Sequence, residues 1–242
     1  MPTIVQLQRA NHGGHFRAFG LRGVARLIDP FLGVDHAWMG GPTFPPHAHA
    51  GFSAVSYVFL DSETGLANRD SLGTNNLIQP GGLHWATAGS GMVHEEVPAE
   101  PGKTVHSLQI FVNLAPPLRQ VAPSVLSLEP LDVPVLPQDG VKIRIPLGHF
   151  AGQRSPLRPP TEVALLDISM EASSELRVPV APGQCVFLMP IHGATHIDGT
   201  PYALDALRVP VYPAQAEEHW IHLRAEQGAS KIVLFSGAPL QA

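Results

Sequence analysis

Two short pairs of polar residues have the types and the spacing of metal ligands. His47 and His49 are two residues apart in FPPHAHAGFSAVSYVF, residues 44–59, and His94 and Glu96 have the same spacing in GSGMVHEEVPAE. Residues two apart in a β-strand point to one face of the sheet, so each pair presents both side chains to the same side. Three imidazoles and one carboxylate converging from neighbouring strands would suit Fe, Ni, Mn, Cu or Zn and leave coordination positions for water or substrate.

A His-x-His pair taken alone is also typical of solvent-facing residues at the start of a strand, and only the second pair favours a metal site. Histidines in the second half of the chain form no such pair, and we expect them to be surface or loop residues: His192, His196, His219 and His222. Cys185, beside Val186 and Phe187, is expected to be a buried apolar residue rather than a reactive thiol.

The elements that must position these residues are predicted to be strands. Segments with period-2 alternation or short β-branched runs recur at Ser53–Leu60, Thr104–Leu114, Glu162–Ser169, Gln184–Pro190 and Lys231–Ser236. Turn signals such as DSETG, QPGGL and HIDGTP separate them, and the chain contains 23 glycines and 25 prolines. No window of 12 or more residues has a clean helical period, so the sequence predicts an all-β fold of the sandwich or barrel kind.

A proline-rich stretch divides the chain. Prolines repeat every few residues between Ala115 and Asp139, which excludes the interior of a regular sheet. We therefore expect one domain at residues 1–120, a connector at 121–139 and a second domain at 140–242. The similarity of IQPGGLHWATAG in the first half to VAPGQCVFLMPIHG in the second suggests two copies of one β-fold.

Composition excludes several classes of function. The net charge is −5, and the 15 lysines and arginines form no basic stripe, which argues against direct nucleic-acid binding. The longest apolar runs are far below the roughly 20 residues that span a membrane. The N-terminal residues show no apolar signal segment, and one cysteine cannot form an intramolecular disulfide, so we expect a cytoplasmic protein.

At this point the residues resemble a known family. The order FPPHAHAGFSAVSYVF, DSLG, IQPGGLHWATAGSGMVHEE and HSLQIFVNL, from about Arg26 to Pro117, is similar to the N-terminal signature of the pirins, which belong to the cupin superfamily. The C-terminal half resembles them chiefly in its strand pattern and in VLFSGAPL. The resemblance implies a monomer of two cupin-type β-barrels, of which the N-terminal one binds one metal ion. The unpaired histidines of the second half predict a C-terminal barrel without metal.

The family's four ligands fall on His47, His49, His94 and Glu96, the residues that strand geometry selects. The resemblance implies one divalent first-row transition metal ion, with iron as the first expectation and Ni, Mn, Co, Cu or Zn as alternatives, because this ligand set does not define the ion. His106 falls on the family's next histidine. By strand parity it could lie beside the site as a catalytic or substrate contact, or it could be a hydrogen-bonded strand histidine.

Some pirins have quercetin 2,3-dioxygenase activity, so the resemblance implies a metal-dependent enzyme that cleaves quercetin-like flavonols or another small phenolic substrate with O2. Glu96 would then be both ligand and general base. The alternatives are a non-enzymatic metal-binding regulatory protein acting through a protein partner, and an oxygenase or isomerase for another small substrate. Expected pocket residues are Phe44, Phe52, Trp85, Met92 and Phe111.

The chain departs from the family's His-Pro-His-Arg-Gly-Phe-Glu motif near the pocket. Ala48, Ala50 and Ser53 replace the proline, the arginine and the glutamate. The ligands are kept and their surroundings are changed. These departures bear on the substrate more than on the metal.

Overall fold

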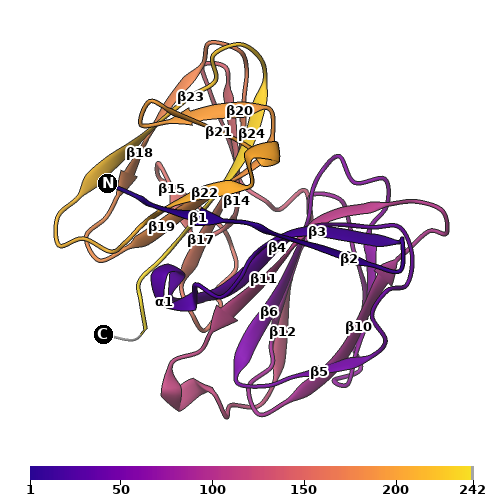
Figure 1. The fold of residues 1–242 in the computed structure, drawn as a ribbon. Coiled ribbons are helices and arrows are strands. Elements are labelled where there is room, and N and C mark those ends of the chain that lie inside the picture. The colour runs from indigo at the N-terminus through magenta and orange to yellow at the C-terminus, as the bar shows by residue number, and fades with distance from the viewer. Residues whose placement is uncertain (241–242) are drawn as a thin grey trace.

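The structure is a computed structural model that describes residues 1–240, so the last two residues of the predicted second domain lie outside it. It is built almost entirely of strands arranged as two β-barrels (Figure 1), which confirms the predicted all-β class. The described helical elements are the single turn α1 (Ala25–Ile28) and two 3-10 turns, η1 (Pro116–Leu118) and η2 (Leu204–Ala206). No helix within residues 1–240 is long and apolar enough to cross a membrane.

The first barrel consists of a seven-stranded and a four-stranded antiparallel sheet. The large sheet has the order β12-β9-β6-β11-β4-β3-β2 and the small sheet the order β5-β10-β7-β8. Their bounds are β2 (Gln8–His12), β3 (Phe16–Leu21), β4 (Phe31–Met39), β5 (His47–His49), β6 (Phe52–Val58), β7 (Leu66–Asp70), β8 (Asn75–Ile78), β9 (Leu83–Thr87), β10 (Met92–Pro98), β11 (Val105–Asn113) and β12 (Ser124–Leu128).

The second barrel repeats this plan. Its large sheet has the order β1-β22-β19-β24-β17-β14-β13, its small sheet the order β18-β23-β20-β21, and β15 pairs with β16. The bounds are β1 (Thr3–Gln6), β13 (Val135–Gln138), β14 (Val141–Leu147), β15 (His149–Phe150), β16 (Gln153–Arg154), β17 (Val163–Met170), β18 (Glu175–Val180), β19 (Cys185–His192), β20 (Ala194–Ile197), β21 (Thr200–Ala203), β22 (Arg208–Tyr212), β23 (His219–Arg224) and β24 (Ser230–Gly237).

The two large sheets share one apolar core. Phe187 and Phe235 of the second barrel stack with ring centroids 4.6 Å apart, and Phe31 of the first barrel meets both rings edge to face at 5.2 and 5.7 Å. The Tyr57 hydroxyl donates a hydrogen bond across the interface to Asp167 at 2.8 Å. The second barrel therefore packs directly behind the sheet that carries β6 and β11.

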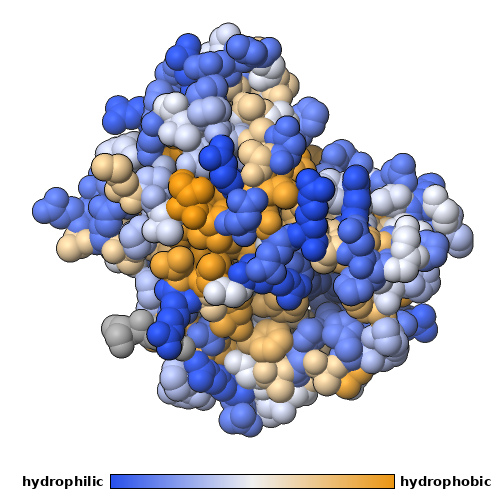
Figure 2. All heavy atoms as spheres, viewed as in Figure 1, coloured by the Kyte–Doolittle hydropathy of each residue, from blue (hydrophilic) through white to orange (hydrophobic). Residues whose placement is uncertain are grey.

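One edge strand of each large sheet comes from outside the segment that forms the rest of that barrel. β1, at the N-terminus, pairs with β22 of the second barrel, while β12, in the proline-rich segment, pairs with β9 of the first. Figure 2 shows apolar residues gathered on the face beside β1 and α1, where Ile4 is 48% and Leu27 39% exposed. The division into 1–120, 121–139 and 140–242 stays a prediction, and the segment 121–139 contributes β12 and β13 to the edges of the two large sheets.

Candidate metal centre

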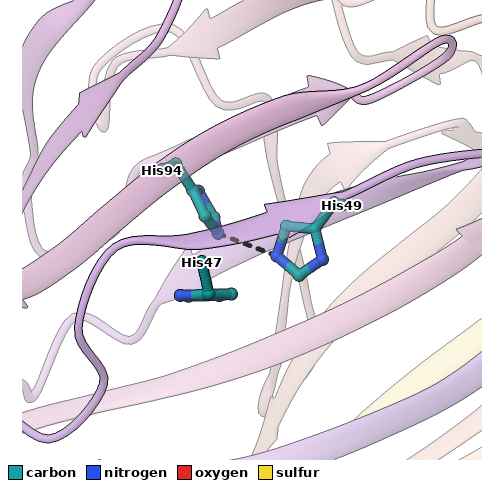
Figure 3. A group of neighbouring side chains, drawn as sticks. All are labelled: His47, His49 and His94. Atoms are coloured by element: carbon teal, nitrogen blue, oxygen red, sulfur yellow. Dashed lines mark hydrogen bonds between the residues drawn. The ribbon is translucent and has the colours of Figure 1, made fainter.

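Three histidines from two paired strands point into the first barrel. β5 pairs antiparallel with β10, so that His47 lies opposite His94 and His49 opposite Met92. The imidazoles converge (Figure 3), with ring centroids 4.7 to 4.8 Å apart and the Nε2 atoms of His49 and His94 separated by 2.9 Å. One potential ligand atom from each ring lies within 4.8 Å of the other two. The i, i+2 spacing and the strand pairing together create this cluster.

Burial keeps the His49 and His94 rings neutral. Burial, followed by the neighbouring histidines, lowers the pKa of His94 to about 3, and burial followed by His47 lowers the pKa of His49 to about 4. His47 holds its Nδ1 atom 3.0 Å from the carbonyl oxygen of Pro45. If Nδ1 carries the proton in this bond, the Nε2 lone pair is free for a ligand bond, as is common in metal sites.

The residues present fit a metal ion. Three imidazole nitrogens are a donor set for divalent first-row metals, and a single ion would satisfy all three at once. The Nδ1 atom of His94 is buried and finds no hydrogen-bond partner among the described residues. The triad is also the one group of three or more potential ligands with this spacing within residues 1–240. The arrangement supports a single metal site.

Glu96 lines the same cavity but stands apart from the triad. Its carboxylate lies outside the group of ligand atoms formed by the three histidines. Both of its oxygens are within hydrogen-bond distance of the Ser56 hydroxyl, at 2.8 and 2.7 Å. Burial raises the pKa of Glu96 to about 7, although the hydrogen bond from Ser56 acts in the opposite direction. The carboxylate can therefore gain or lose a proton near neutral pH.

The cavity has a volume of about 470 Å³ and a mainly apolar wall. Polar groups other than the triad and Glu96 are few, among them Gln109 and Arg22, whose guanidinium is paired with the Asp35 carboxylate. The apolar lining includes Phe16, Met39, Phe44, Leu66 and Phe111. Of the expected pocket residues, Phe44 and Phe111 are part of this lining. Phe52 packs on His49 at 5.3 Å between ring centroids, and Trp85 and Met92 are buried in the core.

The structure does not bring His106 to this cavity. Ser107, Gln109 and Phe111 of β11 line the cavity, and side chains alternate along a strand, so His106 points to the opposite face. There its Nδ1 lies 3.0 Å from Asp61, its Nε2 lies 2.7 Å from His36, and its ring stacks on Trp38. Strand parity thus separates His106 from the triad instead of placing it alongside.

Sequence reasoning missed Ser56 and the Arg22–Asp35 pair. Ser56 interrupts an apolar run in β6 at a position that faces the barrel interior, and such a buried hydroxyl in a strand is a signal that could have been used. Arg22 and Asp35 come from separate parts of the chain, and only the pairing of β3 with β4 brings their backbones together. No sequence spacing indicates that contact.

The second barrel has aliphatic side chains where the first has the candidate ligands. When β5 and β10 are aligned with β18 and β23 by strand order and inward parity, the four positions correspond to Val178, Val180, Ile221 and Leu223. All four are buried in the second barrel's core. His219 and His222 lie on β23, and His222 is 3.3 Å from Glu175 at the surface.

Comparison with known sequences places the chain among named relatives. The sequence profile described as Pirin matches residues 15–112. "Pirin-like protein 2" of Arabidopsis thaliana is 31% identical over 72% of this chain, but the match spans only 53% of that protein. A Pseudomonas aeruginosa protein named "Putative quercetin 2,3-dioxygenase" is 33% identical, covering 88% of this chain and 76% of its own, and pirin of Rattus norvegicus is 30% identical, covering 89% and 74%.

Solved structures share the fold over nearly the whole chain. A crystal structure from Geobacillus kaustophilus has a TM-score of 0.88 at 26% identity and covers 99% of this chain and 96% of its own. Quercetin 2,3-dioxygenase from Acinetobacter baumannii has a TM-score of 0.85 at 22% identity, covering 99% and 86%. The bacterial pirin YhhW from Escherichia coli, in complex with nickel(II), has a TM-score of 0.75 at 17% identity, covering 99% and 100%. The two barrels are therefore of the cupin type.

Proposed function

The chain belongs to the pirin family, and from this premise we propose that it is a metal-dependent dioxygenase that cleaves a quercetin-like flavonol or another small phenolic substrate with O2. The observation that carries the proposal is the convergence of three imidazoles and a buried carboxylate on one mainly apolar cavity. A relative and a structural neighbour named as quercetin 2,3-dioxygenases support it. The reaction itself is argued by analogy with these proteins.

In this proposal one first-row transition metal ion is held by His47, His49 and His94, with Glu96 as a fourth ligand. Iron is the first candidate, and the nickel(II) bound to the Escherichia coli pirin supports a site open to other ions. Such an ion, when bound, polarises and orients a substrate that chelates it through adjacent oxygens.

Two features of the chain would act on the substrate. Phe16, Phe44 and Phe111 line a cavity of about 470 Å³, which falls within the roughly 300–1,000 Å³ typical of small-molecule sites and offers aromatic surface to a planar ring. Glu96, whose pKa lies at about 7, can accept the proton of a substrate hydroxyl at neutral pH. His106 has no part in this proposal because it faces away from the cavity.

The test begins with metal content. Protein purified without added metal is expected to carry close to one metal ion per chain by elemental analysis, and His94→Ala is expected to lose it. His192→Ala serves as a control, since His192 is an exposed histidine at the end of β19 and far in sequence from the triad. A wild-type protein that binds no ion from Fe, Mn, Ni, Co or Cu would contradict the metal site.

Activity is tested separately. Protein loaded with each of these ions is incubated with quercetin under air, and we expect loss of quercetin absorbance and release of carbon monoxide with at least one of them. Glu96→Gln should lower the rate by 100-fold or more if Glu96 is the base, on the order of a general base's contribution. If the protein binds metal but turns over quercetin with none of the ions, the metal site is supported and the dioxygenase is refuted. That outcome favours a regulatory protein, whose partner can be sought by pull-down with and without chelator.

A further inference from the structure

The hydrogen bond between Ser56 and Glu96 crosses the interior of the first barrel. Ser56 lies on β6 in the large sheet and Glu96 on β10 in the small sheet, and their exposed fractions are 2% and 9%. The Ser56 hydroxyl oxygen is 2.8 and 2.7 Å from the two carboxylate oxygens, so the open end of the carboxylate faces Ser56. Glu96 therefore has to turn away from Ser56 before both oxygens can approach the histidines.

Ser56 has a second acceptor within reach. Gln109 lies directly opposite Ser56 on the neighbouring strand β11, and its side-chain oxygen is 3.1 Å from the Ser56 hydroxyl. A hydroxyl carries one proton and serves one acceptor at a time. If Glu96 turns away from Ser56, the Ser56 hydroxyl can rotate and donate its hydrogen bond to the Gln109 side-chain oxygen, so the hydroxyl is not left unsatisfied in a buried position.

We propose that Ser56 is a positioning residue that controls whether Glu96 reaches the metal. The Ser56 bond holds the carboxylate against the wall of the large sheet and competes with its coordination at the triad. The proposal rests on the metal site proposed above and adds that Glu96 is an exchangeable fourth ligand. A carboxylate that can leave the ion is one that can accept a substrate proton.

The competition predicts the direction of the effect of removing the hydroxyl. Ser56→Ala abolishes a bond that is made when the Glu96 carboxylate faces Ser56 instead of the histidines, so the substitution favours the coordinated position. Cobalt(II) should then bind more tightly to Ser56→Ala than to the wild type, by about tenfold, which is the order of one hydrogen bond to a charged group. Ser56→Thr keeps the hydroxyl and should restore the wild-type affinity.

The measurement is competition between the protein and a chromophoric chelator for cobalt(II), combined with the visible spectrum of the bound ion, which reports its coordination. A double-mutant cycle separates positioning from a general effect on packing. In the Glu96→Gln background, Ser56→Ala should leave the affinity and the spectrum unchanged, whereas a packing defect would persist. Far-ultraviolet circular dichroism and thermal unfolding confirm that each variant is folded.

The outcomes distinguish this inference from the proposal on which it rests. Wild-type protein that fails to bind cobalt(II) near one per chain would overturn the metal site and the role of Ser56 with it. Normal binding by the wild type, loss of binding in His94→Ala, and unchanged or weaker binding in Ser56→Ala would overturn the role of Ser56 alone. An effect of the same size in the Glu96→Gln background would also overturn it.

Discussion

Cys185 is shielded from solvent at the start of β19. Its thiol is buried and lies 3.0 Å from the carbonyl oxygen of Leu27, and burial followed by Asp29 raises its pKa to about 12. The thiolate is the reactive form, so the folded protein should not react with Ellman's reagent within an hour at pH 8. One thiol per chain should appear at once in 6 M guanidinium chloride. Rapid labelling of the folded protein would contradict the buried position.

His36 makes the stability of the fold sensitive to acid. Burial, and then the facing His106, lower its pKa well below 6.5, against the opposing effect of Asp61, while Arg17 and Lys231 act in the same direction as burial. Below pH 6.5 His36 becomes protonated in the unfolded chain but stays neutral in the folded protein. The free energy of unfolding therefore decreases as the pH falls. The contribution is about 1 kcal/mol at pH 5.5.

The measurement is urea unfolding at pH 7.5 and at pH 5.5. We expect His36→Phe to lose less stability between these two values than the wild type does, by about 1 kcal/mol, with the remaining loss due to other buried histidines such as His84. Val34→Ala, on the same strand and face, should lower stability equally at both pH values. An identical pH dependence in His36→Phe and the wild type would refute this assignment.

The candidate ligands show which contacts can be predicted from local residue patterns and which cannot. The i, i+2 rule places His47 and His49 on one face because it depends only on local strand geometry, whereas His94 joins them through the pairing of β5 with β10. The orientation of Glu96 depends on Ser56, 40 residues away on another sheet, and no local pattern contains it. The sequence leaves His106 open between a contact in the site and a hydrogen-bonded strand histidine, because its parity has no reference without the Ser107 and Gln109 side chains that line the cavity.

The turn after β5 links the candidate ligands to the rest of the first barrel. β5 has only three residues, and the next turn is fixed by a hydrogen bond from the Gly51 amide to the Gly89 carbonyl at 2.8 Å. Gly89 has a φ of +51°, and a Cβ atom there would collide with the backbone oxygen of Val121. Gly89→Ala should therefore destabilise the fold by about 2 kcal/mol or more and weaken metal binding.

Gly73→Ala is the matched control for this prediction. Gly73 also has a positive φ, +88°, but a Cβ atom there meets no atom of residues 1–240 within 4 Å. Gly73→Ala should lower the free energy of unfolding only by its backbone strain, about 1–2 kcal/mol, and should leave metal affinity unchanged. Unfolding in urea and cobalt(II) titration measure the two effects. Equal effects of the two substitutions on metal affinity would show that the Gly89 turn does not support the site.

The positions of strands are easier to predict from the sequence than the correspondence between strands of the two barrels. The five segments with period-2 or β-branched runs coincide with β6, β11, β17, β19 and β24, whose alternation follows from one buried face. The Pro-Gly similarity, however, compares the turn before β9 with the turn before β19, and the sheet orders make β22 the counterpart of β9. Pro-Gly turns suit any strand entry, so the similarity does not identify equivalent strands.

At the scale of the whole molecule, β1 ties the N-terminus to the second barrel. It forms four residue pairs with β22 and places Val5 in the core that both barrels share, and Leu7 follows it into that core. Deletion of residues 1–7 should lower the free energy of unfolding by about 3 kcal/mol or more, since two apolar side chains lose their burial. The freed edge of β22 should also promote self-association.

Thermal unfolding and size-exclusion chromatography at several concentrations test the deletion. Ile4→Ser is the matched control, because Ile4 lies on the same strand but is exposed, and its effect should stay within about 0.5 kcal/mol. An unfolding midpoint unchanged by the deletion would mean that β1 is dispensable to the second barrel.

Two adjacent residues of β6 connect the site to the interface between the barrels. Ser56 points into the interior of the first barrel, where its hydroxyl contacts Glu96, and Tyr57, on the opposite face, donates a hydrogen bond to Asp167, which is also 3.2 Å from Lys231. Tyr57→Phe leaves a buried carboxylate with one partner fewer and should cost about 1–3 kcal/mol of stability. Because the site lies on the other face of the strand, metal affinity should change by less than about twofold.

Ser56→Ala should raise metal affinity and, in the metal-free protein, should also cost about 1–3 kcal/mol of stability, since it leaves the buried Glu96 carboxylate without the Ser56 hydrogen bond. Urea unfolding and cobalt(II) competition on both variants give the comparison. If Tyr57→Phe altered metal affinity as strongly as Ser56→Ala does, the second barrel would be influencing the site through β6. If only Ser56→Ala changes metal affinity, the second barrel supports the sheet behind the site, while residues of the first barrel set its affinity for metal.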